Sequence, residues 1–460
     1  MDGAIPPASS CHGGRETMIA AAKAAGKSDV LARLATDYPQ GPHDQPQSMC
    51  PAFGSLRVGL RMRRVATILS GSACCVYGLT FTSHFYGARR SVGYVPFDSE
   101  TLVTGQLFED IRKAVRETAR PDDYDAVVII NLCVPTASGV PLDLLPKQID
   151  GVRIIGIDVP GFGVPTHAEA KDVLAGAMLK YARLEAERGA VARPRAPMAE
   201  GPKISLIGEL FPGDPPGLSA MLAPMGVSLA PGLPAREWRD LYGALDCTAA
   251  AAVHPFYTAT IREFAAAGRN IVGSAPVGLD GTAQWLEMVG HATNATAAAT
   301  DAAKAKALPA IKTALDDNQI SARMIVSGYE GSELLVARLL IEAGADIPYV
   351  GTALPRTDWS AADCDWLEAR GTHVQFRAAL EQDIAALHDV KPDLAFGTTP
   401  LVQAAKEAGM PAVYFTNMVS ARPLFGAAGA AALPAIVKAQ TAGASRFSRM
   451  LEFFEGGAAC

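Results

Sequence analysis

Short apolar runs alternate with amphipathic helical segments in the first part of the chain. The runs at 65–69, 126–132 and 152–159 are rich in valine and isoleucine, and the segment 107–119 has apolar residues at helical spacing. Strands that are apolar at nearly every position are typical of parallel sheets covered by helices on both faces. The pattern therefore predicts a parallel α/β sheet in this part of the chain.

The same alternation recurs in two further blocks. Strands are predicted at 203–207, 249–253 and 270–272 after a linker rich in proline, alanine and arginine, and again at 323–326, 348–351, 393–396 and 412–415, with a helical connection at 285–315. We predict an α/β fold of three Rossmann-like domains with parallel sheets. The expected units are an N-terminal arm at 1–45, a cysteine-bearing domain at 46–200, a second domain at 201–318 and a third domain with C-terminal helices at 319–460.

Composition narrows the classes of function. The chain has 460 residues, with 41 Lys and Arg against 47 Asp and Glu, so no basic excess favours nucleic acid. No uninterrupted apolar run approaches the length of a membrane span and no secretory leader pattern opens the chain, so we expect a cytoplasmic protein that does not span the membrane. No complete glycine-rich phosphate loop is present, and we expect this chain itself to bind no ATP.

Three of the eight cysteines lie where one predicted secondary-structure element ends and the next begins. Cys75 and Cys133 follow the predicted strands 65–69 and 126–132, and Cys50 lies in a turn that contains Pro51 and Gly54. Ligands gather at the carboxyl ends of parallel strands, and a helix start near Cys75 favours its thiolate. The side chain of neighbouring Cys74 diverges from that of Cys75, so we choose Cys75.

Three thiolates are one short of a closed metal site. A 4Fe-4S cluster and a structural zinc ion each take four protein ligands, so the pattern suggests a fourth ligand from another chain. The spacing is wide, and three unrelated small buried cysteines remain an alternative interpretation. We interpret Cys247, Cys364 and Cys460 as incidental thiols without a function.

The local sequences around these cysteines resemble those of a known protein family, and the resemblance extends over nearly the whole chain. The stretches are Gln-Ser-Met-Cys-Pro-Ala-Phe-Gly at 47–54, Gly-Ser-Ala-Cys-Cys-Val-Tyr-Gly at 71–78, Asn-Leu-Cys-Val-Pro-Thr-Ala-Ser-Gly at 131–139 and Gly-Ile-Asp-Val-Pro-Gly-Phe-Gly-Val-Pro-Thr-His at 156–167. Together they resemble the nitrogenase-like reductases, three-domain α/β components that hold iron-sulfur clusters between paired subunits. In particular they look like the light-independent enzymes that reduce chlorophyll precursors.

The resemblance implies a cofactor, partners and a reaction. Cys50, Cys75 and Cys133 are expected to ligate a 4Fe-4S cluster whose fourth cysteine comes from a homologous subunit, called Z in this family. The implied assembly is a heterotetramer with two copies of each subunit, and a separate ATP-hydrolysing iron-sulfur homodimer, subunit X, delivers electrons to it. The implied reaction is the two-electron reduction of the ring B 7,8 double bond of chlorophyllide a in bacteriochlorophyll synthesis.

Residues that contact the pigment are harder to select. Phe81, His84, Phe85 and Tyr86 follow Cys75 closely and are candidates for the pigment cavity, with His84 a candidate proton donor or magnesium ligand. The alternatives are that these aromatic residues form core and that the histidine is a structural hydrogen-bonder. His167 is interpreted as a helix N-terminal residue rather than a catalyst.

Three other functions remain open. One is a Rossmann-type small-molecule binding protein whose cysteines bind nothing. The N-type subunit of the light-independent protochlorophyllide reductase has the same pattern of cluster-binding cysteines but belongs to an enzyme that reduces ring D. A cofactor-assembly scaffold without turnover belongs to a different class, and it predicts a transferable cluster and no pigment reduction.

Overall fold

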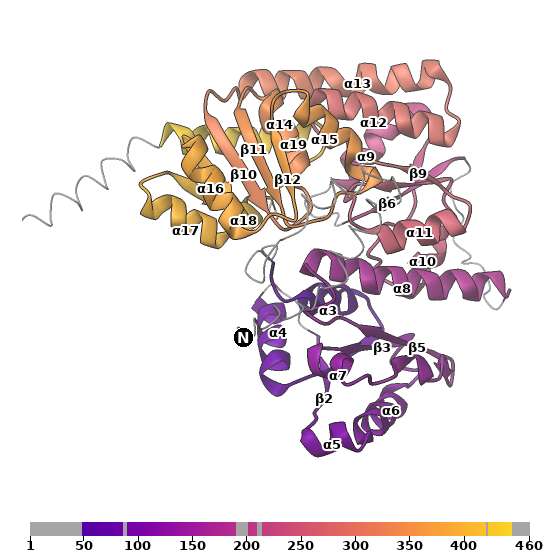
Figure 1. Ribbon diagram of the computed structural model, residues 1–460. Coiled ribbons are helices and arrows are strands. Elements are labelled where there is room, and N and C mark those ends of the chain that lie inside the picture. The colour runs from indigo at the N-terminus through magenta and orange to yellow at the C-terminus, as the bar shows by residue number, and fades with distance from the viewer. Residues whose placement is uncertain (1–47, 86–89, 190–200, 209–213, 420–421, 444–460) are drawn as a thin grey trace, which may run out of the picture.

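The computed structural model describes residues 48–85, 90–189, 201–208, 214–419 and 422–443, and the predicted N-terminal arm lies outside them. Its described part contains three sheets that follow one another along the chain (Figure 1). Each sheet lies within one of the predicted domains. The prediction of an α/β fold with three parallel sheets is confirmed.

The first sheet has the strand order β2-β1-β3-β5-β4, and only the short β4 runs antiparallel to its neighbour. Alternate residues of β3 face opposite sides and all six are buried, which explains the continuous apolar run in the sequence. One face packs against α3 and α8 and the other against α6. The elements of this domain are α3 (Pro51–Arg61), β1 (Val65–Ser70), α4 (Ala73–Phe85), β2 (Gly93–Val95), α5 (Ser99–Val103), α6 (Gln106–Thr118), β3 (Ala126–Asn131), α7 (Cys133–Ala137), β4 (Gln148–Ile149), β5 (Val152–Asp158) and α8 (His167–Glu187).

The second and third sheets share one large hydrophobic core. The second sheet has the order β7-β6-β8-β9 and the third has the order β12-β11-β10-β13-β14, with every pairing parallel. The second domain contains β6 (Lys203–Ile207), α9 (Pro215–Leu222), β7 (Ser228–Leu229), α10 (Trp238–Leu245), β8 (Ala249–Ala252), α11 (Thr258–Ala266), β9 (Asn270–Val272), α12 (Gly278–Thr293) and α13 (Ala297–Asp317). The third contains β10 (Arg323–Gly328), α14 (Glu333–Glu342), β11 (Asp346–Thr352), α15 (Ala361–Glu368), β12 (His373–Phe376), α16 (Leu380–Val390), β13 (Leu394–Gly397), α17 (Thr399–Glu407), β14 (Ala412–Tyr414), α18 (Phe415–Val419) and α19 (Gly426–Ala442).

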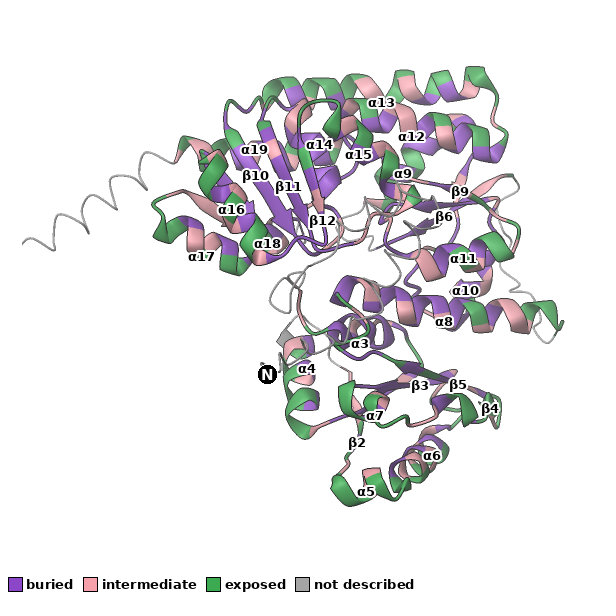
Figure 2. Cartoon of the chain, in the orientation of Figure 1, coloured by how far each residue is buried: buried purple, intermediate pink, exposed green. Residues whose placement is uncertain are grey.

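Buried residues fill the sheets, whereas the helices present exposed residues on their outer sides (Figure 2). Among the helices of the described ranges, none is long and apolar enough to cross a membrane. The predicted helical connection at 285–315 contains two helices, because Asn294 takes a left-handed conformation after α12 and Thr296 caps α13.

Candidate functional site

The three singled-out cysteines each stand at the start of a helix. Cys50 is the N-cap of α3, Cys75 is the third residue of α4 and Cys133 is the first residue of α7. The sequence placed Cys50 in a turn, and the structure corrects this: Pro51 occupies the first helical position, where a missing N–H costs nothing and the fixed φ suits a helix. Thiolates are favoured at helix N-termini.

Two of the cysteines leave neighbouring strands at the same edge of the first sheet. β1 and β3 pair in parallel from Val65 opposite Ala126 to Ser70 opposite Asn131. Cys75 follows β1 and Cys133 follows β3, so the two thiols emerge at one carboxyl edge. The loop after β5, the next strand in the sheet, contributes the backbone N–H of Gly161, which donates to Cys133 Sγ at 3.2 Å.

The third cysteine joins them from α3. Protein around the sulfur raises the pKa of the Cys50 thiol, and the backbone N–H groups of Ala52 and Phe53 oppose this increase. Charge on Cys133 and on Cys75 raises the Cys50 pKa further, so both of these sulfurs lie within electrostatic reach of Cys50. The structure thus brings together the three residues that the sequence selected, and all three are exposed.

Ser72 lies beside the adjacent pair of cysteines. Its hydroxyl donates to Cys75 Sγ at 3.1 Å and lies 3.3 Å from Cys74 Sγ. The hydrogen bonds from Ser72 and from Cys75 lower the pKa of the Cys74 thiol. Both thiols of the pair are exposed, so the choice of Cys75 over Cys74 stays a prediction.

The donor set suits a cluster better than a single ion. Within the described ranges no group of three or more His, Cys, Asp or Glu side chains is close enough to hold one metal ion. A cluster distributes its thiolate ligands over several iron atoms, so its cysteines lie further apart than the ligands of one ion. Three exposed thiols from three helix starts, two of them accepting hydrogen bonds, are the type of ligand that an iron-sulfur cluster takes.

The surface around these cysteines is unusually apolar. Tyr77 and Phe81 on α4 are 74% and 62% exposed and their rings stack at 6.4 Å, which excludes a core role for Phe81. Val134 and Phe162, next to Cys133 and Gly161, are 41% and 61% exposed. His84 is also exposed, whereas the side chain of Phe85 and all of Tyr86 lie outside the described residues. Large exposed apolar patches mark surfaces that another molecule covers.

Cys247 and Cys364 stand apart from this site. Both are buried, and burial raises their pKa values to about 11 and about 12. Neutral buried thiols are poor metal ligands, which agrees with the interpretation that they are incidental. Cys11 and Cys460 lie outside the described residues.

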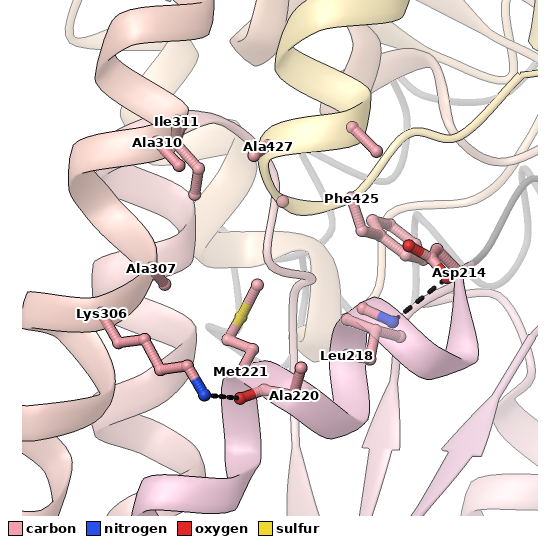
Figure 3. A pocket seen from close by; sticks show the side chains of 13 residues that line it. Asp214, Leu218, Ala220, Met221, Lys306, Ala307, Ala310, Ile311, Phe425 and Ala427 are labelled. Carbon is pink, nitrogen blue, oxygen red and sulfur yellow. Dashed lines mark hydrogen bonds between the residues drawn. The ribbon is translucent and has the colours of Figure 1, made fainter.

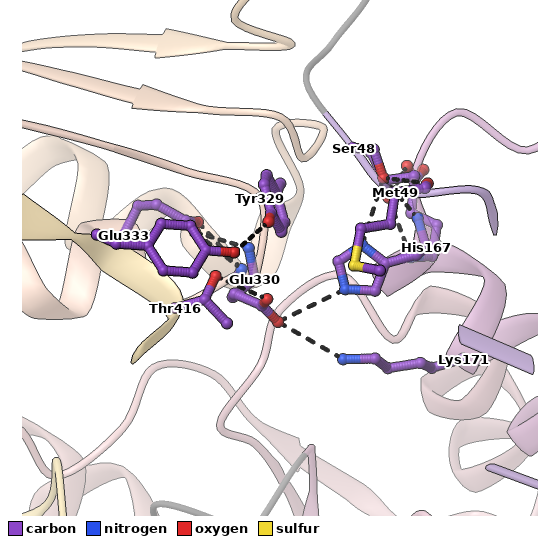
Figure 4. Close-up of polar contacts among 12 residues, drawn as sticks. Ser48, Met49, His167, Lys171, Tyr329, Glu330, Glu333 and Thr416 are labelled. Atoms are coloured by element: carbon purple, nitrogen blue, oxygen red, sulfur yellow. Dashed lines mark hydrogen bonds and ion pairs between the residues drawn. The ribbon is translucent and has the colours of Figure 1, made fainter. Parts of the chain in front are cut away.

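Ser48, two residues before Cys50, belongs to a polar network that the sequence did not predict. His167 begins α8, as expected for a helix N-terminal residue, but it also contacts Ser48 and the carboxylate of Glu330 from the third domain (Figure 4). Lys171, one turn further along α8, lies 3.8 Å from the same carboxylate. We call Ser48, His167, Lys171 and Glu330 the interdomain network. No local signal identifies it, because its partners are far apart in the sequence.

The clearest apolar cavity lies elsewhere. It has a volume of about 230 Å³ and lies between α9, α13 and α19, away from α4 and the cysteines (Figures 1 and 3). Its polar groups are already used, since Lys306 Nζ donates to the Ala220 carbonyl at 3.1 Å and Asp214 Oδ1 accepts from Gly217 N–H at 3.1 Å. Sites for large ligands are usually roughly 300–1,000 Å³, so this cavity is too small for a macrocycle.

Comparisons with known proteins agree with this architecture. Residues 50–438 match the family model described as nitrogenase component 1 type oxidoreductase. The chain is 63% identical to the "Chlorophyllide reductase 52.5 kDa chain" of Cereibacter sphaeroides over 98% of its own length and 90% of that protein. It is also 63% identical to the chain of the same name from Rhodobacter capsulatus, over 97% and 90% of the two lengths.

Solved structures extend the likeness to the fold. "Nitrogenase Cp1 at pH 6.5" superimposes with a TM-score of 0.68 at 16% identity, over 86% of this chain and 93% of that chain. "Nitrogenase Cp1 at pH 5" gives a TM-score of 0.65 at 13% identity, over 88% and 90%. The fold is therefore of the nitrogenase component 1 type, as predicted. With the family match across most of its length, the chain belongs to the nitrogenase component 1 type oxidoreductases.

Proposed function

We propose that the chain is the Y-type subunit of a light-independent chlorophyllide a reductase, within its catalytic component. The observation that carries this is a group of three exposed thiols, two at one edge of the first sheet and Cys50 within electrostatic reach of both, in a chain 63% identical to proteins named as chlorophyllide reductase chains. The proposed reaction is the two-electron reduction of the ring B 7,8 double bond of chlorophyllide a, in bacteriochlorophyll synthesis.

The proposed cofactor is a 4Fe-4S cluster held by Cys50, Cys75 and Cys133. Such a cluster supplies electrons one at a time. The residues around it fix the thiolates: Ser72 donates to Cys75 and Gly161 N–H donates to Cys133. Charge-assisted hydrogen bonds of this kind stabilise negative charge on the ligand sulfurs.

The exposed apolar surface supports a partner subunit. Tyr77 lies two residues after Cys75, and Val134 and Phe162 are next in sequence to Cys133 and Gly161. All three are exposed, and we assign them to the contact with a homologous subunit Z that supplies the fourth ligand. The proposed assembly contains two copies of each subunit. Electrons arrive from the ATP-hydrolysing iron-sulfur homodimer X, and because that step uses ATP, we place the complex in the cytoplasm.

The pigment contacts are proposed on the same helix. Phe81 and His84 lie beyond Cys75 on exposed positions of α4, and Phe85 and Tyr86 follow them in sequence. A flat aromatic face suits stacking against a macrocycle, and an exposed imidazole suits proton donation or magnesium ligation. We therefore keep these four residues as the candidate pigment contacts.

The test is anaerobic purification of the chain with subunit Z, followed by iron and sulfide analysis, electron paramagnetic resonance and native mass. Cys50→Ala, Cys75→Ala and Cys133→Ala are each expected to remove most of the iron and the activity. Cys364→Ala is the matched control, because that thiol is buried away from the site and its loss leaves iron unchanged.

Three results would contradict the proposal. Equal tolerance of substitution at all four cysteines overturns the ligand assignment, and an active iron-free complex overturns the cluster. Turnover of protochlorophyllide alone, in an assay that offers both pigments, indicates the N-type subunit instead. A cluster that transfers to another protein without any pigment reduction indicates an assembly scaffold.

A further inference from the structure

The three cysteines differ in what holds them in place. Cys75 and Cys133 follow β1 and β3, which are paired along their whole length at the centre of the first sheet. Cys50 follows no strand, since it is the residue before α3, a helix that packs mainly on α8. The position of Cys50 therefore depends on α8 and on the segment that contains Ser48.

Ser48 is fixed by the first residue of α8. The backbone N–H of His167 donates to Ser48 Oγ at 2.9 Å, and Nδ1 of the His167 ring lies 3.3 Å from the same oxygen. The Ser48 hydroxyl also lies 2.9 Å from the Met49 carbonyl, directly before Cys50. His167 thus contacts the segment that leads into Cys50 through both its backbone N–H and its imidazole.

That imidazole is held from the third domain. Glu330 follows β10 and directs its carboxylate at His167 Nε2, 3.6 Å away, and at Lys171 Nζ, 3.8 Å away (Figure 4). The side chains of His167 and Lys171 are only 1% exposed, and Thr416 donates to the other Glu330 oxygen at 3.1 Å. Burial raises the pKa of Glu330, but interaction with His167, Lys171 and Arg57 outweighs burial and holds that pKa well below its usual range.

A second contact joins the same two parts of the protein. Arg377, in the loop after β12, donates through two nitrogens to the two oxygens of Glu169 at 2.5 and 2.7 Å. Glu169 also accepts from the Thr166 hydroxyl at 2.8 Å, at the N-cap of α8. The third domain therefore contacts the first turn of α8 through two charged side chains, Glu330 and Arg377. The same turn donates a hydrogen bond to Ser48.

We propose that Glu330 is a positioning residue that acts through His167 and Ser48 to fix Cys50 relative to Cys75 and Cys133. The inference rests on the proposed function only in giving Cys50 the role of a cluster ligand. Removing the carboxylate takes one contact from each of two buried side chains, His167 and Lys171, which destabilises this arrangement locally. The segment at Cys50 then opens more often than the sheet edge that carries Cys133.

The test measures hydrogen–deuterium exchange of individual backbone amides in the full chain, after removal of iron by a chelator. Glu330→Gln and the milder, uncharged change Ser48→Ala are each expected to raise the exchange rate of the Phe53 amide, which donates to the Cys50 carbonyl at 3.0 Å, by about threefold or more. The Thr136 amide, which donates to the Leu132 carbonyl beside Cys133 at 3.2 Å, should change little. Glu263→Gln is the control, because it removes an ion pair with Arg183 at 2.8 Å near the other end of α8.

An unchanged exchange rate of the Phe53 amide in both variants would overturn the proposal, as would a parallel rise at the Phe53 and Thr136 amides, which indicates general loosening. An equal effect of Glu263→Gln would likewise overturn it. None of these readouts depends on a bound cluster, whereas the iron content of the complex tests the proposed function separately. The two inferences can therefore fail independently.

Discussion

Gly54 allows α3 to approach α8 more closely than any other residue would. A Cβ atom at this position would lie 1.7 Å from the carbonyl oxygen of His167 and 3.2 Å from Cγ of Lys171. Close carbon-to-oxygen contacts are about 3.3 Å or longer, so Gly54→Ala requires the helices to separate by roughly 1.5 Å. The obstacle is backbone, so no side-chain rotation relieves it.

The expected cost follows from two opposing effects. Overpacking of a tight contact costs about 1–3 kcal/mol, and a backbone obstacle places Gly54→Ala at the upper end. Alanine offsets part of this by about 1 kcal/mol, because it is the better helix former. A net loss of about 2 kcal/mol lowers the melting temperature of a domain this size by roughly 4–8 °C.

Calorimetry of the full chain beside Gly78→Ala provides the test. Gly78 lies within α4 and a Cβ there meets nothing within 4 Å, so the same substitution should raise the melting temperature slightly. The two variants are thus expected to shift in opposite directions. Equal shifts, or a Gly54→Ala variant as stable as the unchanged chain, would refute the packing argument.

Two other predictions concern hydrogen bonding and pH. Ser72→Ala removes the donor 3.1 Å from Cys75 Sγ. Because a reduced cluster carries more negative charge, its potential should fall by about 40 mV if the bond is about 1 kcal/mol stronger in the reduced state. Redox titration of the complex measures this, with Thr82→Ala as control, and an unchanged or raised potential contradicts it. Glu333 is 1% exposed, and burial raises its pKa from 4.5 to about 7. Its contribution to stability is therefore present below pH 4.5 and is lost as pH rises through about 7, by about 3 kcal/mol. Melting curves across that range should fall less for Glu333→Gln, and parallel curves would contradict the assignment.

The sequence predicts those elements whose signal is local. β3 is recognisable because all of its residues are buried, and β10 for nearly the same reason. β2 and β12 were missed, because a three-residue strand and an alternating one at the edges of their sheets carry little apolar signal. α3 was missed because Pro51 and Gly54 resemble turn residues. Glycine is needed at position 54 because α8 packs against it. Since α8 begins more than a hundred residues later, local sequence patterns do not reveal this contact.

The candidate site divides in the same way. The positions of Cys75 and Cys133 follow from where strands end, which the sequence indicates. The surface exposure of Phe81 does not, because an aromatic residue on a helix has the same local pattern whether a core or a partner covers it. The interdomain network was equally hidden, because the partners of His167 come from the segment before α3 and from the third domain.

The arrangement gives the three thiols unequal dependence on the rest of the protein. Cys75 and Cys133 are fixed by a sheet that forms within one domain, so folding of that domain is sufficient to place them. Cys50 acquires its position only when α3 packs on α8 and Glu330 reaches His167 from the third domain. A cluster held by all three thiols would therefore bind most tightly to a chain whose first and third domains are already in contact. Cluster binding and that domain contact should then stabilise each other, because a ligand that favours one arrangement is favoured by it in return.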